Sequence, residues 1–208
     1  ILSNLAAYRL ARATATFTKE AIGGEDVVDG VIAAYAFAEA DPFRAATSNK
    51  GIMNGIDPLI VATGNDWRGI EAACHAYCSY KGKYTSMTRW EKNANGDLTG
   101  SIELPALCGL VGGDTKILPA AKVGVKILGV QTAAELAQVI AAVGLAQNFA
   151  AMRALATDGI QKGHMKLHAR NIATVAGATG EMLDKVVAAM VAEKNISVER
   201  AKELLSTL

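Results

Sequence analysis

The sequence has few aromatic residues, few prolines, an odd number of cysteines and almost no excess of one charge. Of its 208 residues, 5% are aromatic, four are proline and three are cysteine. Three cysteines do not build a disulfide framework, which favours a reducing, cytoplasmic environment. The formal net charge is +1, from 21 basic and 20 acidic residues. This balance excludes the strongly basic surface that is typical of a nucleic-acid-binding protein.

Long apolar runs are also missing. The longest uninterrupted runs, 31–38 and 186–192, are much shorter than the roughly 18 residues that a membrane-spanning helix needs, so no membrane segment is expected. Hydrophobic residues still make up 51% of the chain, and it contains 20 glycines. The many alanines among the hydrophobic residues, together with the glycines, have small side chains and predict closely packed helices around a compact core. The chain begins with Ile1 inside a helix-like pattern, so we expect it to be cut at its front edge.

The hydrophobic pattern changes along the chain. Strand-like patterns cover 14–18, 84–91 and 98–104, and Asn95-Gly96 between the last two is a strong hairpin signal. Helical patterns cover 27–39, 59–62, 67–80, 118–128, 133–156, 163–176, 181–193 and 198–205, with Asp26 and Ser197 as N-caps. Because the strands are confined to the first half, the sequence predicts an α+β fold with a small antiparallel hairpin or sheet.

The segment 43–57 is the least regular part of the first half, and we predict a loop there. Asp57-Pro58 is expected to start the next helix, with the aspartate as N-cap and the proline at the first helical position. Polar residues gather in this loop and on the junction at 64–66. They are Arg44, Thr47, Asn49, Lys50, Asn54 and Asp66. Two such junctions joined by a short apolar helix favour a functional site over a solvated surface.

Two histidines suggest a second kind of site. His164 and His168 have the spacing of two zinc ligands on one helix face, but Met165 replaces the glutamate of the metalloprotease pattern. A zinc-dependent hydrolase is therefore a weaker hypothesis, which the metal content of the protein would decide. Cys74 and Cys78 lie one helical turn apart and are better explained as buried thiols.

Several longer strings resemble the hydroxymethylglutaryl-coenzyme A reductase family. The resemblance is to its bacterial, soluble class II branch, and within that branch to the degradative enzymes. The strings are 48–58 (SNKGIMNGIDP), 62–68 (ATGNDWR), 100–105 (GSIELP), 111–113 (VGG), 145–148 (LAQN) and 163–171 (GHMKLHARN). The resemblance implies that residues 1–158 belong to a helix-rich, substrate-binding large domain. Residues 159–208 would then form an all-helical C-terminal flap that moves over the site.

The resemblance also implies a function: an oxidoreductase that interconverts hydroxymethylglutaryl-CoA and mevalonate plus CoA by two nicotinamide hydride transfers. Lys50 would stabilise the oxyanion, Asp66 would lie beside Lys50 and orient it, and His164 would protonate the CoA thiolate. Arg44 suits the substrate carboxylate. The substrate-binding residues that the resemblance implies are Arg44, Thr47, Asn54, Gln147, Asn148 and His168.

The cofactors and partners that follow from the resemblance are NAD or NADP, with NAD favoured by the degradative branch, and coenzyme A as substrate or product. No metal, nucleic acid or membrane is expected. The protein would be a cytoplasmic homodimer with its active site at the subunit interface, and dimers could assemble further.

The chain departs from the family pattern in two strings. The ENVIG-type string that carries a catalytic glutamate does not occur here, nor does the DAMGAN-type string of the cofactor domain. We therefore expect the N-terminal region and the nicotinamide-binding domain to be absent, and the 208 residues alone to be inactive. A truncated, non-catalytic module that binds coenzyme A or dimerises is the alternative, although such a module has no need of Lys50, Asp66 and His164 together.

Overall fold

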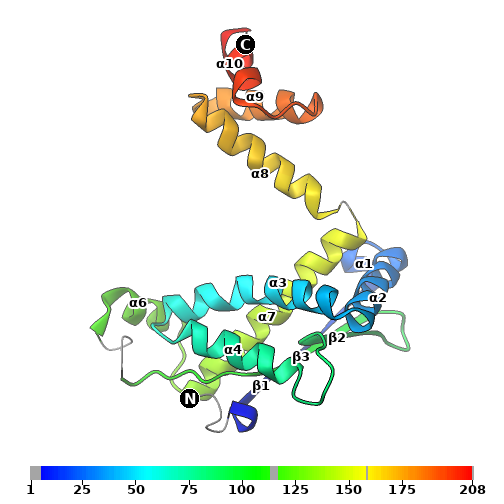
Figure 1. The fold of residues 1–208 in the computed structure, drawn as a ribbon, viewed down its shortest axis with the longest axis vertical. Helices are drawn as coiled ribbons and strands as arrows, with labels where there is room; N and C mark the ends of the chain where they lie inside the picture. The colour runs from blue at the N-terminus through cyan, green and yellow to red at the C-terminus, as the bar shows by residue number, and fades with distance from the viewer. Residues whose placement is uncertain (1–5, 113–116, 158, 208) are drawn as a thin grey trace. The chain divides into compact units, whose positions relative to one another are not determined.

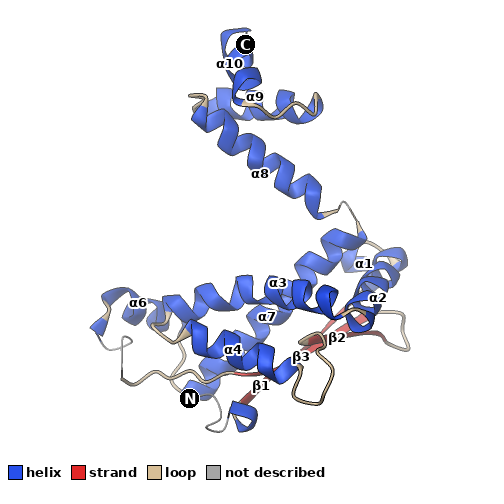
Figure 2. Cartoon of the chain, in the orientation of Figure 1, coloured by secondary structure: helices blue, strands red, loops and turns tan. Residues whose placement is uncertain are grey.

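The structure is a computed structural model that describes residues 6–112, 117–157 and 159–207, without the side chains of residues 160–164 and 166. The chain divides into two compact units, Ile1–Thr157 and Asp158–Leu208. Each unit has its own hydrophobic core. The division falls one residue before the expected one, and the roles of the two units as substrate domain and flap stay predictions. Helices make up most of the described residues, as Figure 2 shows.

A three-stranded antiparallel sheet belongs to the first unit. Its strands are β1 (Leu10–Phe17), β2 (Thr88–Lys92) and β3 (Leu98–Pro105), and the spatial order is β1-β3-β2 (Figure 1). β1 pairs with β3 along its full length, although the two strands lie far apart in the sequence. Side chains alternate between a buried face and an open polar face on β3. The predicted α+β fold with a small antiparallel sheet is confirmed.

The predicted hairpin is confirmed. Gly96 has a φ of 83°, and its N–H donates to the carbonyl of Asn93 at 3.0 Å in the turn between β2 and β3. The predicted start of the first strand was wrong, because β1 begins at Leu10 and not at residue 14. A 3-10 turn, Ala6–Tyr8, precedes the strand, and residues 1–5 of the helix-like pattern lie outside the described residues. Pairing with β3 extends the strand, and local pattern does not report such a distant partner.

The helices of the first unit are α1 (Lys19–Ile22), α2 (Glu25–Ala40), α3 (Pro42–Ala62), α4 (Trp67–Cys78), α6 (Pro119–Leu128) and α7 (Ala133–Ala156). The helix predicted at 27–39 is present as α2, with Gly24 and not Asp26 at its N-cap. Asp41 ends α2, because the residue before a proline avoids the helical conformation. The Asp41 carboxylate also accepts a hydrogen bond from the backbone N–H of Arg44 at 2.7 Å and so caps α3.

Helix α3 overturns the prediction of a loop at 43–57. It is one helix of 21 residues that continues through Pro58, so Asp57 is not an N-cap. The helix begins instead at Pro42, where a proline in the first position is well tolerated. Four side chains at helical spacing are buried in the core, namely Ile52, Met53, Ile56 and Ile60. Their burial outweighs the low helix propensity of Gly51 and Gly55.

Helix α7 runs through the middle of the first unit and packs against β1, β3, α2 and α3. Its bounds are those that the sequence predicts. Among the described residues it is the one helix whose length and composition would allow it to cross a membrane, although its longest unbroken apolar runs are short. Leu136, Ile140 and Leu145 are buried in the unit's core, as expected for the central helix of a folded domain.

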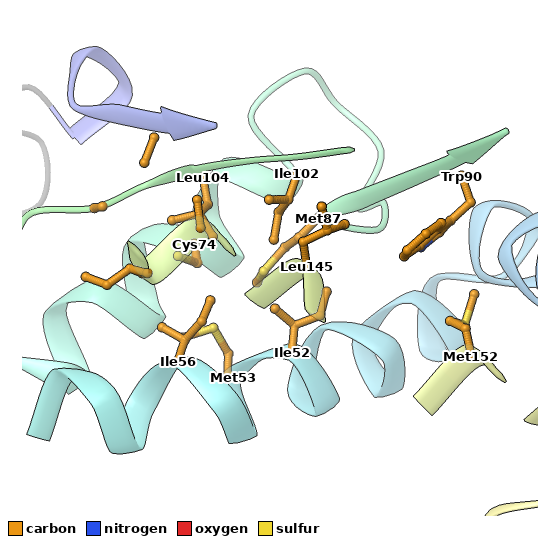
Figure 3. Close-up of a cluster of buried hydrophobic side chains, with 14 of the residues drawn as sticks. Ile52, Met53, Ile56, Cys74, Met87, Trp90, Ile102, Leu104, Leu145 and Met152 are labelled. Carbon is orange, nitrogen blue, oxygen red and sulfur yellow. The ribbon is translucent and has the colours of Figure 1, made fainter. Parts of the chain in front are cut away.

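Figure 3 shows this core between α3 and the sheet. Ile52, Met53 and Ile56 of α3 lie on one side, and Ile102 and Leu104 of β3 lie on the other. The apolar side of α3 is therefore buried in the core, and the opposite side of the helix faces away from the core.

The second unit contains α8 (Ile160–Val175), α9 (Gly180–Ala192) and α10 (Val198–Thr207). All three predicted helices are present to within a few residues. The predicted N-cap is confirmed, because the Ser197 hydroxyl accepts a hydrogen bond from the backbone N–H of Arg200 at 3.1 Å. Ala169, Val186 and Met190 contribute to a core that this unit forms by itself.

Candidate active site

One face of α3 carries three of the predicted site residues. Thr47, Lys50 and Asn54 follow each other at intervals of three and four residues, which places them in a single row on the helix. All three are exposed. Phe43, at 82% exposure, and Val61, at 57%, extend the row at its two ends. These five residues form the exposed α3 stripe, which faces away from the core side of the helix.

Two cations on α3 have no acidic partner within the described part of the chain. The Lys50 ammonium and the Arg44 guanidinium form no ion pair with any described residue. Arg44 is half-buried at the first turn of the helix. Uncompensated positive charge on one helix attracts anionic ligands. This agrees with a substrate that carries a carboxylate and develops an oxyanion.

Asp66 lies beyond the far end of α3 from Lys50. It is the N-cap of α4, and its carboxylate accepts a hydrogen bond from the backbone N–H of Gly69 at 3.1 Å. At 1.5 Å per residue, Lys50 and Ala62 are about 18 Å apart along the helix axis. That separation exceeds the reach of a lysine side chain. Helix α3 by itself therefore does not bring Asp66 beside Lys50 within one chain, and the expectation that the two side chains lie together stays a prediction.

The turn that precedes Asp66 is fixed by Asn65, a residue without an assigned role in the sequence analysis. The Asn65 side-chain oxygen accepts a hydrogen bond from the N–H of Gly109 at 2.8 Å, and its amide donates to the carbonyl of Thr63 at 3.2 Å. Gly64 in the same turn has a φ of 68°, which few other residues adopt. Residues 64–66 thus form a turn that is held by these hydrogen bonds and leaves Asp66 exposed at the surface.

Gln147 of α7 lies against α3. A Cβ built on Gly55 would lie 2.9 Å from the Gln147 Cβ and 3.2 Å from its Oε1. The absence of a side chain at Gly55 therefore lets the two helices approach and places the Gln147 amide next to the residue that follows Asn54. The structure thus places Gln147 beside Gly55, and its role in substrate binding stays a prediction.

Asn148, in contrast, is a core residue with 2% exposure. Its side-chain oxygen accepts hydrogen bonds from the Thr88 hydroxyl and the Trp90 indole, both at 2.8 Å. Its amide donates to the Ser48 hydroxyl at 3.2 Å. With its oxygen and its amide engaged inside the unit, Asn148 is not placed to touch a substrate, and the predicted contact is corrected to a structural role.

Asp57 has an unusual environment that its proposed role as an N-cap did not anticipate. Its Oδ1 atom is buried and has no hydrogen-bond partner among the described residues. Burial, and to a smaller extent the nearby Glu71 carboxylate, raises the pKa of Asp57 to about 6. Only the continuous helix α3 shows this, because it places Asp57 in mid-helix beside the buried Ile56 and Ile60.

The two histidines lie on α8 in the second unit. His168 is exposed. The side chain of His164 lies outside the described residues, so its proposed role stays a prediction. Where the structure describes the side chains, no group of three or more His, Cys, Asp or Glu residues is arranged to hold a metal ion. The structure does not place either histidine relative to Lys50.

A groove of about 640 Å³ lies elsewhere on the first unit. Its walls include Tyr35, Tyr77 and Arg89, and none of the predicted site residues lines it. The Tyr77 hydroxyl donates a hydrogen bond to Glu103, and this bond, together with burial and the Glu103 charge, raises the pKa of Tyr77 to about 12. The groove is therefore distinct from the exposed α3 stripe.

The cysteines are confirmed as buried free thiols. Cys74, Cys78 and Cys108 are all buried, and none is in a disulfide. Burial raises the pKa of the Cys78 thiol to about 12 and that of Cys74 further still. None of them is a candidate nucleophile at neutral pH.

Comparison with known proteins gives a consistent result. The model of the family described as hydroxymethylglutaryl-coenzyme A reductase matches residues 1–169. A 3-hydroxy-3-methylglutaryl-coenzyme A reductase from Archaeoglobus fulgidus is 61% identical over all 208 residues, which cover 48% of that relative. A probable reductase from Borreliella burgdorferi is 44% identical over 142 residues, 68% of this chain and 32% of the relative.

Solved structures agree. A class II reductase from Streptococcus pneumoniae, bound to NADPH in open conformations, superposes with a TM-score of 0.70 at 39% identity. That match covers 95% of this chain and 49% of the other. A second structure of a reductase from that organism gives a TM-score of 0.71. The chain thus spans about half the length of the relatives that it matches.

Proposed function

The chain belongs to the hydroxymethylglutaryl-coenzyme A reductase family, and on that ground we propose that it supplies substrate-binding and catalytic residues for the interconversion of hydroxymethylglutaryl-CoA and mevalonate plus CoA. The observation that carries this proposal is the exposed α3 stripe. It presents Lys50, which has no acidic partner among the described residues, beside the hydroxyl of Thr47 and the amide of Asn54.

The reaction demands a fixed positive charge at the reacting carbonyl. Reduction of the thioester, and later of the aldehyde, adds hydride to a carbonyl carbon and leaves negative charge on its oxygen. The nicotinamide nucleotide supplies that hydride when it is bound, and we assign its binding to none of the described residues. The Lys50 ammonium stabilises the oxyanion, and such electrostatic stabilisation by one donor is worth about 3–4 kcal/mol.

The remaining roles follow from the chemistry of the groups. Arg44 carries an uncompensated guanidinium that suits the free carboxylate of the substrate, and Gln147 adds an amide beside the exposed α3 stripe. Collapse of the hemithioacetal releases the CoA thiolate. An imidazolium at His164 protonates that thiolate favourably, because the thiol pKa of about 8.5 exceeds that of imidazole, about 6.5. His168, one turn later, is assigned to substrate binding.

A homodimer reconciles the separation of Lys50 and Asp66 with a shared site. Because α3 holds the two side chains too far apart to meet in one chain, a site that uses both draws them from two chains. The large exposed side chains Phe43 and Val61 at the ends of the exposed α3 stripe are of the kind that a subunit interface covers. We assign the active site to that interface and the protein to the cytoplasm.

Mixed dimers test this function. Lys50→Ala and Asp66→Asn are made in a full-length reductase polypeptide that contains this sequence, and each is assayed for substrate-dependent oxidation of NADH and of NADPH. Asparagine keeps the helix cap, so the second change removes the charge alone. Each variant alone should be inactive. After random mixing, about half of the dimers are mixed and each has one intact site, so about a quarter of the wild-type activity should return.

Other outcomes have defined meanings. A mixture that stays inactive places Lys50 and Asp66 in the same chain's site and contradicts the shared site. A wild-type protein that binds coenzyme A but oxidises neither cofactor supports the alternative of a non-catalytic module. His164→Ala should slow thioester reduction more than the reduction of free mevaldehyde, and equal losses would contradict its role as the acid for the thiolate.

A further inference from the structure

The residue before Lys50, Asn49, has a polar side chain that is fully buried. Asn49 has 0% exposure and sits on the core side of α3, while Lys50 points away from the core. A buried side-chain amide is costly unless its hydrogen-bonding groups are satisfied. The contacts of Asn49 therefore show what holds this turn of the helix.

Both ends of the Asn49 amide are engaged by one segment, residues 84–87. Its nitrogen donates to the carbonyl of Thr85 at 2.9 Å and to the Tyr84 hydroxyl at 3.0 Å. Its oxygen accepts a hydrogen bond from the backbone N–H of Met87 at 2.9 Å. An asparagine at this position thus bridges α3 to the segment that leads into β2, and it does so with donors and an acceptor at once.

The direction of the hydrogen bonds continues beyond Asn49. Because the Tyr84 oxygen accepts from Asn49, its own hydrogen is free to be donated to His75 Nδ1, which lies 2.7 Å away. The second ring nitrogen of His75, Nε2, faces Glu71 at 3.8 Å. The Tyr84 hydroxyl therefore joins Asn49 of α3 to His75 of α4.

A second buried anchor adjoins the first. Ser48, immediately before Asn49, accepts a hydrogen bond from the Asn148 amide of α7, and Asn148 is held in turn by Thr88 and Trp90 of β2. The turn of α3 that carries Lys50 is thus tied to α7 and to the segment before β2. These ties resist rotation of the helix about its axis. For a side chain several ångströms from that axis, a rotation of about 10° moves the end group by about 1 Å.

We propose that Asn49 is a positioning residue for Lys50. Asn49 fixes the rotation of this turn of α3 about the helix axis and its position along that axis, and it thereby holds the lysine ammonium at the reacting carbonyl. The inference rests on the proposed function for the role of Lys50. Misplacement of a catalytic group by about 1 Å can cost about a hundredfold in rate. The loss should fall on the hydride-transfer step, since substrate binding depends on other groups.

The test compares Asn49→Ala, Tyr84→Phe and a core control, Met152→Ala, in the full-length reductase polypeptide. Met152 is buried on α7, and no hydrogen bond among the described residues joins it to α3, so its truncation lowers stability without removing a hydrogen bond of Asn49. For Asn49→Ala, kcat per folded enzyme should fall about 10- to 100-fold, with KM for the thioester changed less than about threefold. Tyr84→Phe should give a smaller loss, because Asn49 keeps the Thr85 carbonyl.

The kinetic isotope effect separates positioning from simple loss of folded protein. The transferred hydrogen of the reduced cofactor is replaced by deuterium. The isotope effect on kcat should then rise in the two anchor variants, Asn49→Ala and Tyr84→Phe, and stay unchanged in Met152→Ala. Equal kcat losses in Asn49→Ala and Met152→Ala, with no change in isotope effect, would overturn the proposal. If Asn49→Ala does not fold, Tyr84→Phe decides by the same criteria.

A Lys50→Ala variant in the same series distinguishes this inference from the function on which it rests. Retained activity in Lys50→Ala removes the role of the lysine and with it the positioning role of Asn49. Lost activity in Lys50→Ala, together with normal kinetics in both anchor variants, leaves the proposed function standing and refutes the positioning role alone.

Discussion

Gly55 of α3 and Gln147 of α7 approach so closely that a Cβ built on the glycine would lie 2.9 Å from the Cβ of the glutamine. This approach joins the helix that bears Lys50 to the helix that runs through the core. Within the family string 48–58, Gly55 is therefore needed for helix packing, in addition to any chemical role of that string.

Gly55→Ala should therefore lower the free energy of unfolding by about 1–3 kcal/mol, because the added methyl group must push the two helices apart. Urea unfolding followed by circular dichroism measures the change. Gly51 of the same helix is the matched control, since a Cβ added there meets nothing within 4 Å. Gly51→Ala should instead stabilise the protein by about 0.5–1 kcal/mol. Equal effects at the two glycines would contradict the close approach.

Asn148→Ala should destabilise the first unit by about 2–3 kcal/mol, because Thr88 and Trp90 lose a buried acceptor. Denaturant unfolding monitored by tryptophan fluorescence reports the loss directly. Asn54→Ala removes the same side chain from the exposed face of α3 and should change stability by less than about 0.5 kcal/mol. A neutral Asn148→Ala variant would return that residue to the list of substrate contacts.

Asp57→Asn should stabilise the protein at pH 7. Burial raises the pKa of Asp57 to about 6 in the folded chain, above the value of about 3.9 expected when it is unfolded. Between about pH 4 and pH 6 the folded state keeps the proton and the unfolded state has lost it. The free energy of unfolding contributed by this group therefore falls as the pH rises through that interval.

The amide variant has no such proton to lose, so its advantage should appear above about pH 6 and vanish near pH 4. After allowance for solvent screening of a partly exposed carboxyl, we expect about 1 kcal/mol. Urea unfolding at a series of pH values measures it. Asp26→Asn, at an exposed position on α2, should show no gain at pH 7. A gain at pH 4 as large as that at pH 7 would contradict the raised pKa.

The three cysteines should react slowly with a thiol-specific reagent in the folded protein. All are buried, and burial raises the pKa of each thiol. We expect labelling about a hundredfold slower than in the unfolded chain, because reaction requires local opening. Counting labelled thiols by mass against time gives the rates, and one fast-reacting thiol in the native protein would contradict the burial.

Local sequence signals were sufficient where a structural element depends on its own residues. The Asn95-Gly96 turn, the bounds of α7 and the Ser197 cap of α10 could all be predicted, because left-handed backbone at glycine, helical periodicity and a capping hydroxyl act within a few residues. The candidate site residues could also be named, since they lie in strings that are characteristic of one family.

Only the tertiary structure decided the rest. Glycines and a proline in 43–62 indicated a loop, but contacts of Ile52 and Ile56 with α7 and the sheet make it a single helix. That helix turns Thr47, Lys50 and Asn54 outward in one row, holds Lys50 and Asp66 apart, and turns Asn49 inward. Each outcome depends on burial against partners distant in sequence, and side-chain burial contributes more free energy than local propensity does.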